Sequence, residues 1–401
     1  MRIGIIGAGP GGALCASLLG QAGAAVLLFD FRGVWEKPCG GGVTFKALKR
    51  YPFLDDCFEQ KRLIEQIRVV SPHGARVTVP LQDPLVVYSR DVLNRMVLEK
   101  AIGNGVQFLE ERVLNFEQQN SHWQLQTEKH LYQVDFLIGA DGVNSFVRKK
   151  MSRRFSADDL MMTYGYRVFC QGEDTIEVKF FPNLLGYLWA FARPDNISFG
   201  ICAKLSQNPT HLLKKYLHRF LEQHYPSIHL DTSENRQPDS ECVSRTAGTF
   251  AFNTYSALIP SLRAGTLRQN RVSGQGWALL GDAAGFADPI TCEGIYYALR
   301  SGELLAQALI DSKPHTYAQA CEADFVEDFV HAADLFEKFY QGRLLGSDFI
   351  TRAVQTAARS KILQTLMNSF VAGKQDYRSL RGKLVRQLPA ICFQVMRSAF
   401  T

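Results

Sequence analysis

The spacing of hydrophobic and polar positions changes along the chain, and each change marks a different kind of structure. Apolar runs at 3–6 and 25–29 flank a glycine-rich turn and a helical stretch from 13 to 22, which predicts strand, helix and strand. Residues 67–71 and 75–79 alternate around Pro72-His73-Gly74 and predict a hairpin. Further strands are expected at 86–90, 106–109, 113–116, 123–126 and 134–138, with a helix from Asp91 to about Ile102.

The second half of the chain moves from strand spacing to helix spacing. A β-rich stretch covers about 162–203, an amphipathic helix covers 209–224, and 278–280 forms a buried strand. Apolar spacing then predicts helices over 295–309, 325–339 and 348–370. We expect an α/β protein with a Rossmann-like domain, an antiparallel β-sheet substrate domain and a helical C-terminal region. The expected boundaries are 1–65, 91–160 and 268–330 for the first, 66–90 and 161–267 for the second, and 331–401 for the third.

The first turn carries a dinucleotide-binding fingerprint. Gly7-Ala8-Gly9-Pro10-Gly11-Gly12 follows the first strand, and Asp30 ends the second strand about 20 residues later. Gly7 permits the tight turn, Gly9 lets the backbone approach a pyrophosphate, and Gly12 lets the helix pack on the strand. The helix N-terminus attracts the phosphates, and Asp30 is placed to bind a ribose 2′-hydroxyl.

Cysteine content and charge indicate in which redox compartment the protein works and which classes of partner it binds. Nine scattered cysteines without paired metal-binding spacing fit a reducing cytoplasm, and we predict no metal site. Residues 331–401 hold 11 Lys/Arg against 4 Asp/Glu, while the remaining chain is nearly neutral. This basic tail indicates a surface that binds either anionic lipids, which would give peripheral membrane contact, or an acidic electron-donor protein. The alternative is a solvated helical face without a binding role. Nothing in the sequence suggests nucleic-acid binding.

Two later turns place aspartates where ligands of open α/β sheets bind. Gly139-Ala140-Asp141-Gly142 ends one predicted strand, and Gly281-Asp282-Ala283 ends another. Either turn alone could be a structural bend. The order of the three turns resembles that of FAD enzymes with the p-hydroxybenzoate hydroxylase type of fold.

Three further motifs narrow the resemblance to the geranylgeranyl reductase branch of those FAD enzymes. They are Lys37-Pro38-Cys39-Gly40-Gly41-Gly42, Tyr187-Leu188-Trp189-Ala190-Phe191, and the segment from Pro289 to Ile295, which is similar to that family's Pro-x-x-Gly-Glu-Gly-Ile loop. The chain departs from the family pattern at Ala192-Arg193, where Pro-Lys is usual, and at Cys292, where glycine is usual. The resemblance covers roughly residues 1–310.

The resemblance implies bound FAD and the reduction of isolated double bonds in prenyl chains. It implies that Asp30 lies at the adenosine, Arg90 near the middle of the cofactor, Asp282 at the ribityl-pyrophosphate, and the backbone of Gly294 and Ile295 at the isoalloxazine. The full set of candidate cofactor contacts is Gly7, Gly9, Pro10, Gly11, Gly12, Ala13, Asp30, Phe31, Cys39, Gly40, Gly41, Gly42, Arg90, Val113, Asp141, Asp282, Gly294 and Ile295.

Saturating an unpolarised alkene requires a hydride donor and a proton source, and the sequence offers candidates for binding and protonation. Tyr187, Trp189 and Phe191 alternate, so they share one strand face and either line an apolar tunnel or fill the core. Cys39 could donate a proton, gate the flavin or pair with another thiol, and one hypothesis is that Cys292 approaches it near the ring. Glu293 is a further acid candidate. The alternative for Cys39 is inert packing.

Rival functions use the same scaffold. A flavin monooxygenase or halogenase is the second interpretation, and an electron-transfer flavoprotein that reduces quinone through a partner is the third. A second dinucleotide fingerprint is absent from the sequence, so NAD(P)H has no domain of its own. The reductant is therefore expected to be NAD(P)H docking briefly at the flavin or a small acidic carrier protein.

Overall fold

The computed structural model describes residues 1–56, 60–207, 210–226, 228, 250–344 and 346–398. The chain divides into two compact units, each built from three separate segments. The first unit holds residues 1–37, 90–160 and 259–333, and the second holds 38–89, 161–258 and 334–401. A discontinuous organisation was predicted, but here residues 38–65 and the C-terminal helices belong with the large β-sheet.

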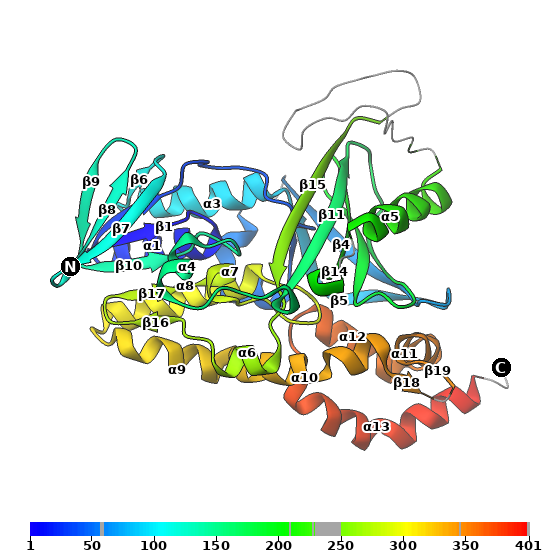
Figure 1. Cartoon of the computed structure of the whole chain (residues 1–401). Coiled ribbons are helices and arrows are strands. Elements are labelled where there is room, and N and C mark those ends of the chain that lie inside the picture. The colour runs from blue at the N-terminus through cyan, green and yellow to red at the C-terminus, as the bar shows by residue number, and fades with distance from the viewer. Residues whose placement is uncertain (57–59, 208–209, 227, 229–249, 345, 399–401) are drawn as a thin grey trace. The chain divides into compact units, whose positions relative to one another are not determined.

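The first unit is organised around a mostly parallel sheet with the strand order β16-β17-β10-β1-β2-β6. Helix α1 follows the first strand directly and packs against both α3 and α8 (Figure 1). Nearly every residue of α1 is buried, which explains why it has small and apolar residues on all sides. The bounds are β1 Arg2–Ile6, β2 Ala25–Phe29, β6 Gln107–Leu109, β10 Phe136–Gly139, β16 Ser273–Gly274, β17 Trp277–Leu279, α1 Pro10–Gln21, α3 Arg90–Gly103 and α8 Ile295–Ile310.

Smaller elements complete the first unit. A three-stranded antiparallel sheet, β7-β8-β9, contacts the main sheet through β9 and β8. The short helix α4 follows β10, and the short helix α7 follows β17. Both helices therefore come after the carboxyl ends of neighbouring strands. The bounds are β7 Val113–Gln119, β8 His122–Thr127, β9 Leu131–Val134, α4 Phe146–Met151, α6 Ala264–Arg268, α7 Gly281–Ala284 and α9 Tyr317–Cys321.

The second unit contains an eight-stranded sheet with the order β15-β11-β14-β13-β12-β4-β5-β3. Its β4–β5 hairpin turns at the predicted Pro72-His73-Gly74, and both strands extend further than the alternating pattern indicated. Strands β12 and β4 pair in parallel, while their neighbours pair antiparallel. The bounds are β3 Gly42–Val43, β4 Lys61–Val70, β5 Arg76–Tyr88, β11 Leu160–Val168, β12 Thr175–Phe180, β13 Gly186–Ala192, β14 Ile197–Lys204 and β15 Phe252–Pro260.

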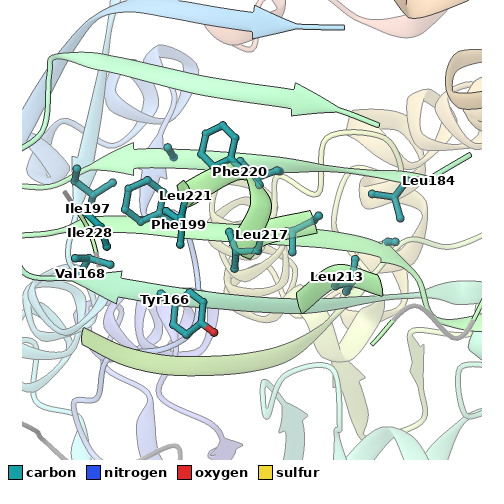
Figure 2. Packing of buried hydrophobic residues seen from close by; sticks show 14 residues of the cluster. Tyr166, Val168, Leu184, Ile197, Phe199, Leu213, Leu217, Phe220, Leu221 and Ile228 are labelled. Atoms are coloured by element: carbon teal, nitrogen blue, oxygen red, sulfur yellow. The ribbon is translucent and has the colours of Figure 1, made fainter. Parts of the chain in front are cut away.

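One face of this sheet is covered by α5 (Thr210–His224). Leu213, Leu217, Phe220 and Leu221 recur at helical spacing, so they project from one side of α5 into a shared core. Figure 2 shows these side chains with those of the strands, among them Phe199. Helix 209–224 was predicted from this pattern; residue 209 lies outside the described residues, and the helix is confirmed from Thr210.

The C-terminal part of the second unit is helical, as expected. Helix α10 spans Glu327–Gln341, and a short β18–β19 ladder follows it. One helix was predicted over 348–370, but the chain forms two. The first ends at Ala357, and the Ser360 side chain caps the second by accepting from the Leu363 N–H. The bounds are α2 Phe45–Arg50, β18 Arg343–Leu344, β19 Ser347–Asp348, α11 Phe349–Ala357, α12 Lys361–Val371 and α13 Tyr377–Arg397.

Candidate functional site

The three glycine turns of the first unit lie at one edge of its sheet. Strands β1, β10 and β17 are parallel neighbours, with Ile6 opposite Gly139 and Gly139 opposite Leu279. The turns that follow them therefore meet at the carboxyl ends of adjacent strands, where open α/β sheets bind ligands.

The glycines of the first turn are needed for different reasons. A Cβ on Gly7 would lie 2.3 Å from the Ala140 carbonyl oxygen, and one on Gly12 would lie 2.0 Å from the Gly7 oxygen. Gly7 also has a φ of +108°, which side chains disfavour. A Cβ on Gly9, by contrast, would have no protein atom within 4 Å. Chain packing therefore requires glycine at 7 and 12, whereas Gly9 faces open space that suits a bound phosphate.

Asp30 lies directly beside this turn, at the end of β2. Its carboxylate accepts hydrogen bonds from the backbone N–H of Ala8 at 2.9 Å and of Arg32 at 3.1 Å. The side chain is half-buried, so lone pairs remain for a ribose hydroxyl. The neighbouring Phe31 is exposed, and the guanidinium of Arg112 stacks over its ring at 3.8 Å.

The aspartates of the other two turns have different surroundings. Asp141 accepts from the Ser145 hydroxyl and from the N–H groups of Phe146 and Val147, so its carboxylate caps α4. Burial raises the pKa of Asp141 despite these hydrogen bonds. Asp282 instead forms an ion pair with the Lys37 ammonium at 2.7 Å, and its side chain is still partly accessible. Asp282 therefore faces a cation, whereas Asp141 organises its own turn.

Arg90 brings a buried positive charge to the start of α3. One terminal nitrogen donates to the Asn94 side chain at 3.2 Å, but its Nε–H has no hydrogen-bond partner among the described residues. Glu36 accepts from the backbone N–H groups of Arg90 and Asp91 at 2.7 and 3.1 Å. The helix was expected to begin at Asp91, but it begins at Arg90, and its first two N–H groups are satisfied by Glu36, 54 positions before Arg90. A buried, unsatisfied guanidinium N–H is a position that an anionic ligand would satisfy.

The loop before α8 is held by Asp288, whose side chain accepts from the N–H groups of Ile290 and Thr291 at 2.8 Å. Cys292 follows with a φ of +60°, in the left-handed region. This is the position where the family pattern has glycine, so the backbone keeps a glycine conformation while carrying a thiol. Glu293 is half-buried, and Gly294 is the N-cap residue of α8.

The cysteine-glycine loop belongs to the second unit. Arg193, almost completely buried, donates from Nη2 to the Cys39 carbonyl at 2.6 Å and from Nε to the Gly40 carbonyl at 3.3 Å. The Ser198 hydroxyl also donates to the Cys39 carbonyl, at 3.1 Å. The backbone N–H of Gly41 donates to the Cys39 sulfur at 3.3 Å. The loop is thus fixed by Ser198 of β14 and by Arg193, the residue after β13.

The glycines of this loop fit closely against neighbouring side chains and backbone. A Cβ on Gly40 would lie 2.8 Å from the Phe191 ring, and one on Gly41, with a φ of +89°, would lie 2.0 Å from the Tyr88 oxygen. Glycine is therefore required here by the protein itself.

Tyr187, Trp189 and Phe191 lie on one face of β13, and Leu188 and Ala190 lie on the other, within the core beneath α5. The rings of Tyr187 and Trp189 are 5.9 Å apart. Trp189 is buried, a Cβ on the opposing Gly200 would lie 2.2 Å from its indole, and its Nε1–H has no hydrogen-bond partner among the described residues. The three aromatics form an apolar layer that is separate from the main core of this unit.

Sequence reasoning missed four residues that hold these segments, namely Glu36, Lys37, Arg193 and Ser198. Lys37 belongs to a motif that was recognised for its cysteine and glycines alone. Arg193 was noted only as a departure from the family pattern. The signal that could have identified Glu36, Lys37 and Arg193 is a charged residue within or next to a recognised motif.

Comparison with known proteins gives concordant results. No protein-family model matches the chain. Geranylgeranyl diphosphate reductase of Rhodobacter capsulatus is 26% identical over 409 residues, covering 94% of both chains. The chloroplastic geranylgeranyl diphosphate reductase of Oryza sativa subsp. japonica is 24% identical over 355 residues, covering 81% of this chain and 69% of its own. A crystal structure of a geranylgeranyl bacteriochlorophyll reductase-like protein from Thermoplasma acidophilum superimposes with a TM-score of 0.72 at 19% identity, covering 96% and 98% of the two chains.

The chain is similar to geranylgeranyl reductases over most of its length and shares the fold of flavin-dependent oxidoreductases.

These similarities confirm the resemblance to geranylgeranyl reductases, the α/β fold class and the assignment as an oxidoreductase. The fold itself is shared more widely, since the flavin-dependent brominase Bmp2 superimposes with a TM-score of 0.65 at 16% identity and 96% coverage of this chain. Within the described residues, no helix has the length and apolar character needed to cross a membrane. The roles of individual site residues, including the approach of Cys39 and Cys292, stay predictions.

Proposed function

We propose that the protein is an FAD-dependent reductase of isolated carbon-carbon double bonds in a prenyl chain. The observation that carries the proposal is the edge of the first sheet. There the open position at Gly9, the carboxylate of Asp30 and the unsatisfied Nε–H of Arg90 provide complementary groups for a flavin dinucleotide. The family relatives are named for geranylgeranyl substrates, which supports the prenyl class.

The residues present fit that cofactor. Gly9 and the N-terminus of α1 would receive the pyrophosphate, Asp30 the adenosine ribose, and Asp282 the ribityl hydroxyls. Lys37 neutralises Asp282 and holds its carboxylate in one orientation. Arg90 would direct its buried guanidinium towards the middle of the cofactor, and Gly294 and Ile295 would place backbone N–H groups at the ring. When bound and reduced, the flavin supplies a hydride.

The second unit supplies the remaining requirements of alkene reduction. The aromatic layer of Tyr187, Trp189 and Phe191 offers apolar surface to a prenyl chain. Cys39 would give its Sγ proton to the carbon that does not receive the hydride, and the Gly41 N–H, which donates to this sulfur, would hold the side chain in place. Water then reprotonates the sulfur. Glu293 is the alternative proton donor. The electrons would come from NAD(P)H or from a small acidic carrier.

The test is product analysis under strict exclusion of oxygen. The yellow protein is reduced chemically, mixed with geranylgeranyl diphosphate or a geranylgeranyl lipid, and its products are weighed. We expect one pair of hydrogens to be added for each double bond reduced. Products that gain oxygen or halide when air and halide are supplied would instead assign a monooxygenase or halogenase. Rapid quinone reduction without any prenyl product would assign an electron carrier.

The role of Cys39 is tested separately by Cys39→Ala, with Cys170→Ala as the matched control because both thiols are half-buried in the second unit. We expect the Cys39 variant to lose most turnover and to keep flavin binding. The control should retain both. Full turnover by Cys39→Ala would transfer the proton-donor role to Glu293 or another group.

A further inference from the structure

Helix α13 presents two distinct faces. Tyr377 and Ile391 are buried on the inner face, and Gln394 accepts a hydrogen bond from the Ser360 hydroxyl at 2.7 Å. Figure 1 shows α13 in red along the edge of the C-terminal helices, next to α12. The contacts that attach the helix to its unit are therefore made by the inner face.

The outer face is apolar at its centre. Val385, Leu388, Phe393 and Met396 are 56–64% exposed. At about 100° per residue, Val385, Phe393 and Met396 point within roughly 80° of one another and away from Ile391, while Leu388 lies on the flank beside Ile391. A surface helix normally needs one apolar side, which α13 already uses at Tyr377 and Ile391. The large exposed apolar side chains outside this inner face therefore call for an additional environment.

Basic residues border this apolar strip. Arg381 and Arg386 are exposed, and the 21 residues of α13 include no aspartate or glutamate. A basic rim around exposed leucine, phenylalanine and methionine is typical of helices that lie in the interface of an anionic bilayer. An acidic protein would match the charge, but it would leave the apolar strip without a complementary surface.

We propose that the outer face of α13 docks on anionic phospholipid membranes, with Val385, Phe393 and Met396 entering the headgroup region and Arg381 and Arg386 binding lipid phosphates. This surface is argued independently of the reaction proposed above. It would deliver the protein to the bilayer in which long-chain prenyl lipids reside.

The experiment is sedimentation of the full-length flavoprotein with vesicles of phosphatidylcholine alone or mixed with phosphatidylglycerol. We expect at least tenfold stronger partitioning onto the anionic vesicles, weakening as salt is raised. The double variant Arg381→Glu/Arg386→Glu should lose roughly thirtyfold in partitioning. Phe393→Ser/Met396→Ser should lose roughly tenfold or more, even at low salt.

Matched controls make the same changes elsewhere. Arg153→Glu/Arg154→Glu reverses two exposed charges, and Leu131→Ser removes an exposed leucine, both outside α13. Thermal unfolding curves that overlay the parent's show that each variant is folded. Failure of the parent to bind anionic vesicles, or equal losses in control and α13 variants, would overturn the proposal. The proposal would also be overturned if the protein bound no vesicles but used α13 to self-associate or to bind an acidic protein. In that case the face would be a protein-binding surface.

Membrane binding and catalysis give separable outcomes. If vesicle binding fails while geranylgeranyl diphosphate is reduced, the membrane surface is wrong and the reaction stands. If vesicles bind but no prenyl substrate is reduced, the proposed reaction is wrong and the surface stands.

Discussion

Gly9→Ala and Gly12→Ala make the same chemical change three residues apart, and the structure predicts opposite consequences. A methyl on Gly9 meets no protein atom within 4 Å, and Gly9 has an extended conformation with φ −64° and ψ 175° that alanine adopts freely. Because alanine is a poorer helix N-cap than glycine, we expect a loss of unfolding free energy of at most about 1 kcal/mol. The fold should therefore survive Gly9→Ala.

The FAD affinity of Gly9→Ala, by contrast, should fall clearly. The new methyl would occupy the space that we assign to the pyrophosphate, and crowding of this kind costs about 1–3 kcal/mol. The corresponding loss of FAD affinity is roughly five- to 150-fold. Gly12→Ala places a methyl 2.0 Å from the Gly7 carbonyl oxygen, so it should cost about 2 kcal/mol or more in stability.

The two effects are separated by two measurements on each variant. Urea unfolding of the flavin-free protein gives the stability, and titration with FAD followed by quenching of flavin fluorescence gives the affinity. Gly103→Ala is the control, because Gly103 is exposed at the end of α3 and its added methyl also meets nothing. Wild-type FAD affinity in Gly9→Ala, or wild-type stability in Gly12→Ala, would refute this account of the turn.

Three further substitutions test other parts of the structure. Cys292→Gly should raise the unfolding free energy by about 1 kcal/mol, because it relieves a left-handed residue, and urea unfolding measures the gain. Burial by itself raises the pKa of Asp159, but hydrogen bonds from groups such as Arg263 outweigh it and lower the pKa to about 2. The stability that Asp159 contributes, about 2 kcal/mol, is therefore present above pH 4 and lost as the pH falls towards 2, so Asp159→Asn should destabilise at pH 7 far more than at pH 2. Arg193→Lys cannot reproduce the guanidinium contacts to the loop carbonyls and should speed alkylation of Cys39 several-fold.

Each of these has a result that would count against it. An unchanged or lower stability of Cys292→Gly would mean that the thiol's own contacts outweigh the strain. A pH-independent difference between Asp159→Asn and the parent would remove the linkage argument. For Arg193→Lys, the exposed Arg95→Lys is the control, and equal alkylation rates in both would show that Arg193 does not hold the loop.

Much of the fold followed from local patterns. The glycine turn after β1, the β4–β5 hairpin and helix α5 were predicted because each is specified by residues close together in the chain. The break near Ser360 was missed because serine in a continuous apolar repeat gives a weak signal, although its hydroxyl is a strong cap.

Fewer contacts of the candidate site could be predicted from the sequence. The carboxylate of Asp141 accepts from N–H groups at the start of α4, a contact that the sequence did not indicate, and its contact with the cofactor stays a prediction. Lys37 pairs with Asp282 across 245 positions, and Arg193 reaches Cys39 across 154. Contacts between such distant residues depend on the packing of whole sheets, which no local pattern specifies.

The most direct measurement is anaerobic reoxidation of the reduced flavoprotein by a prenyl substrate. The colourless reduced protein is mixed with geranylgeranyl diphosphate in a stopped-flow instrument, and the return of the yellow flavin absorbance is followed. The account predicts reoxidation in proportion to the double bonds reduced, with saturation in substrate and no response to a fully saturated analogue. A protein that stays colourless with every prenyl compound and regains its colour only with oxygen or quinone would contradict it.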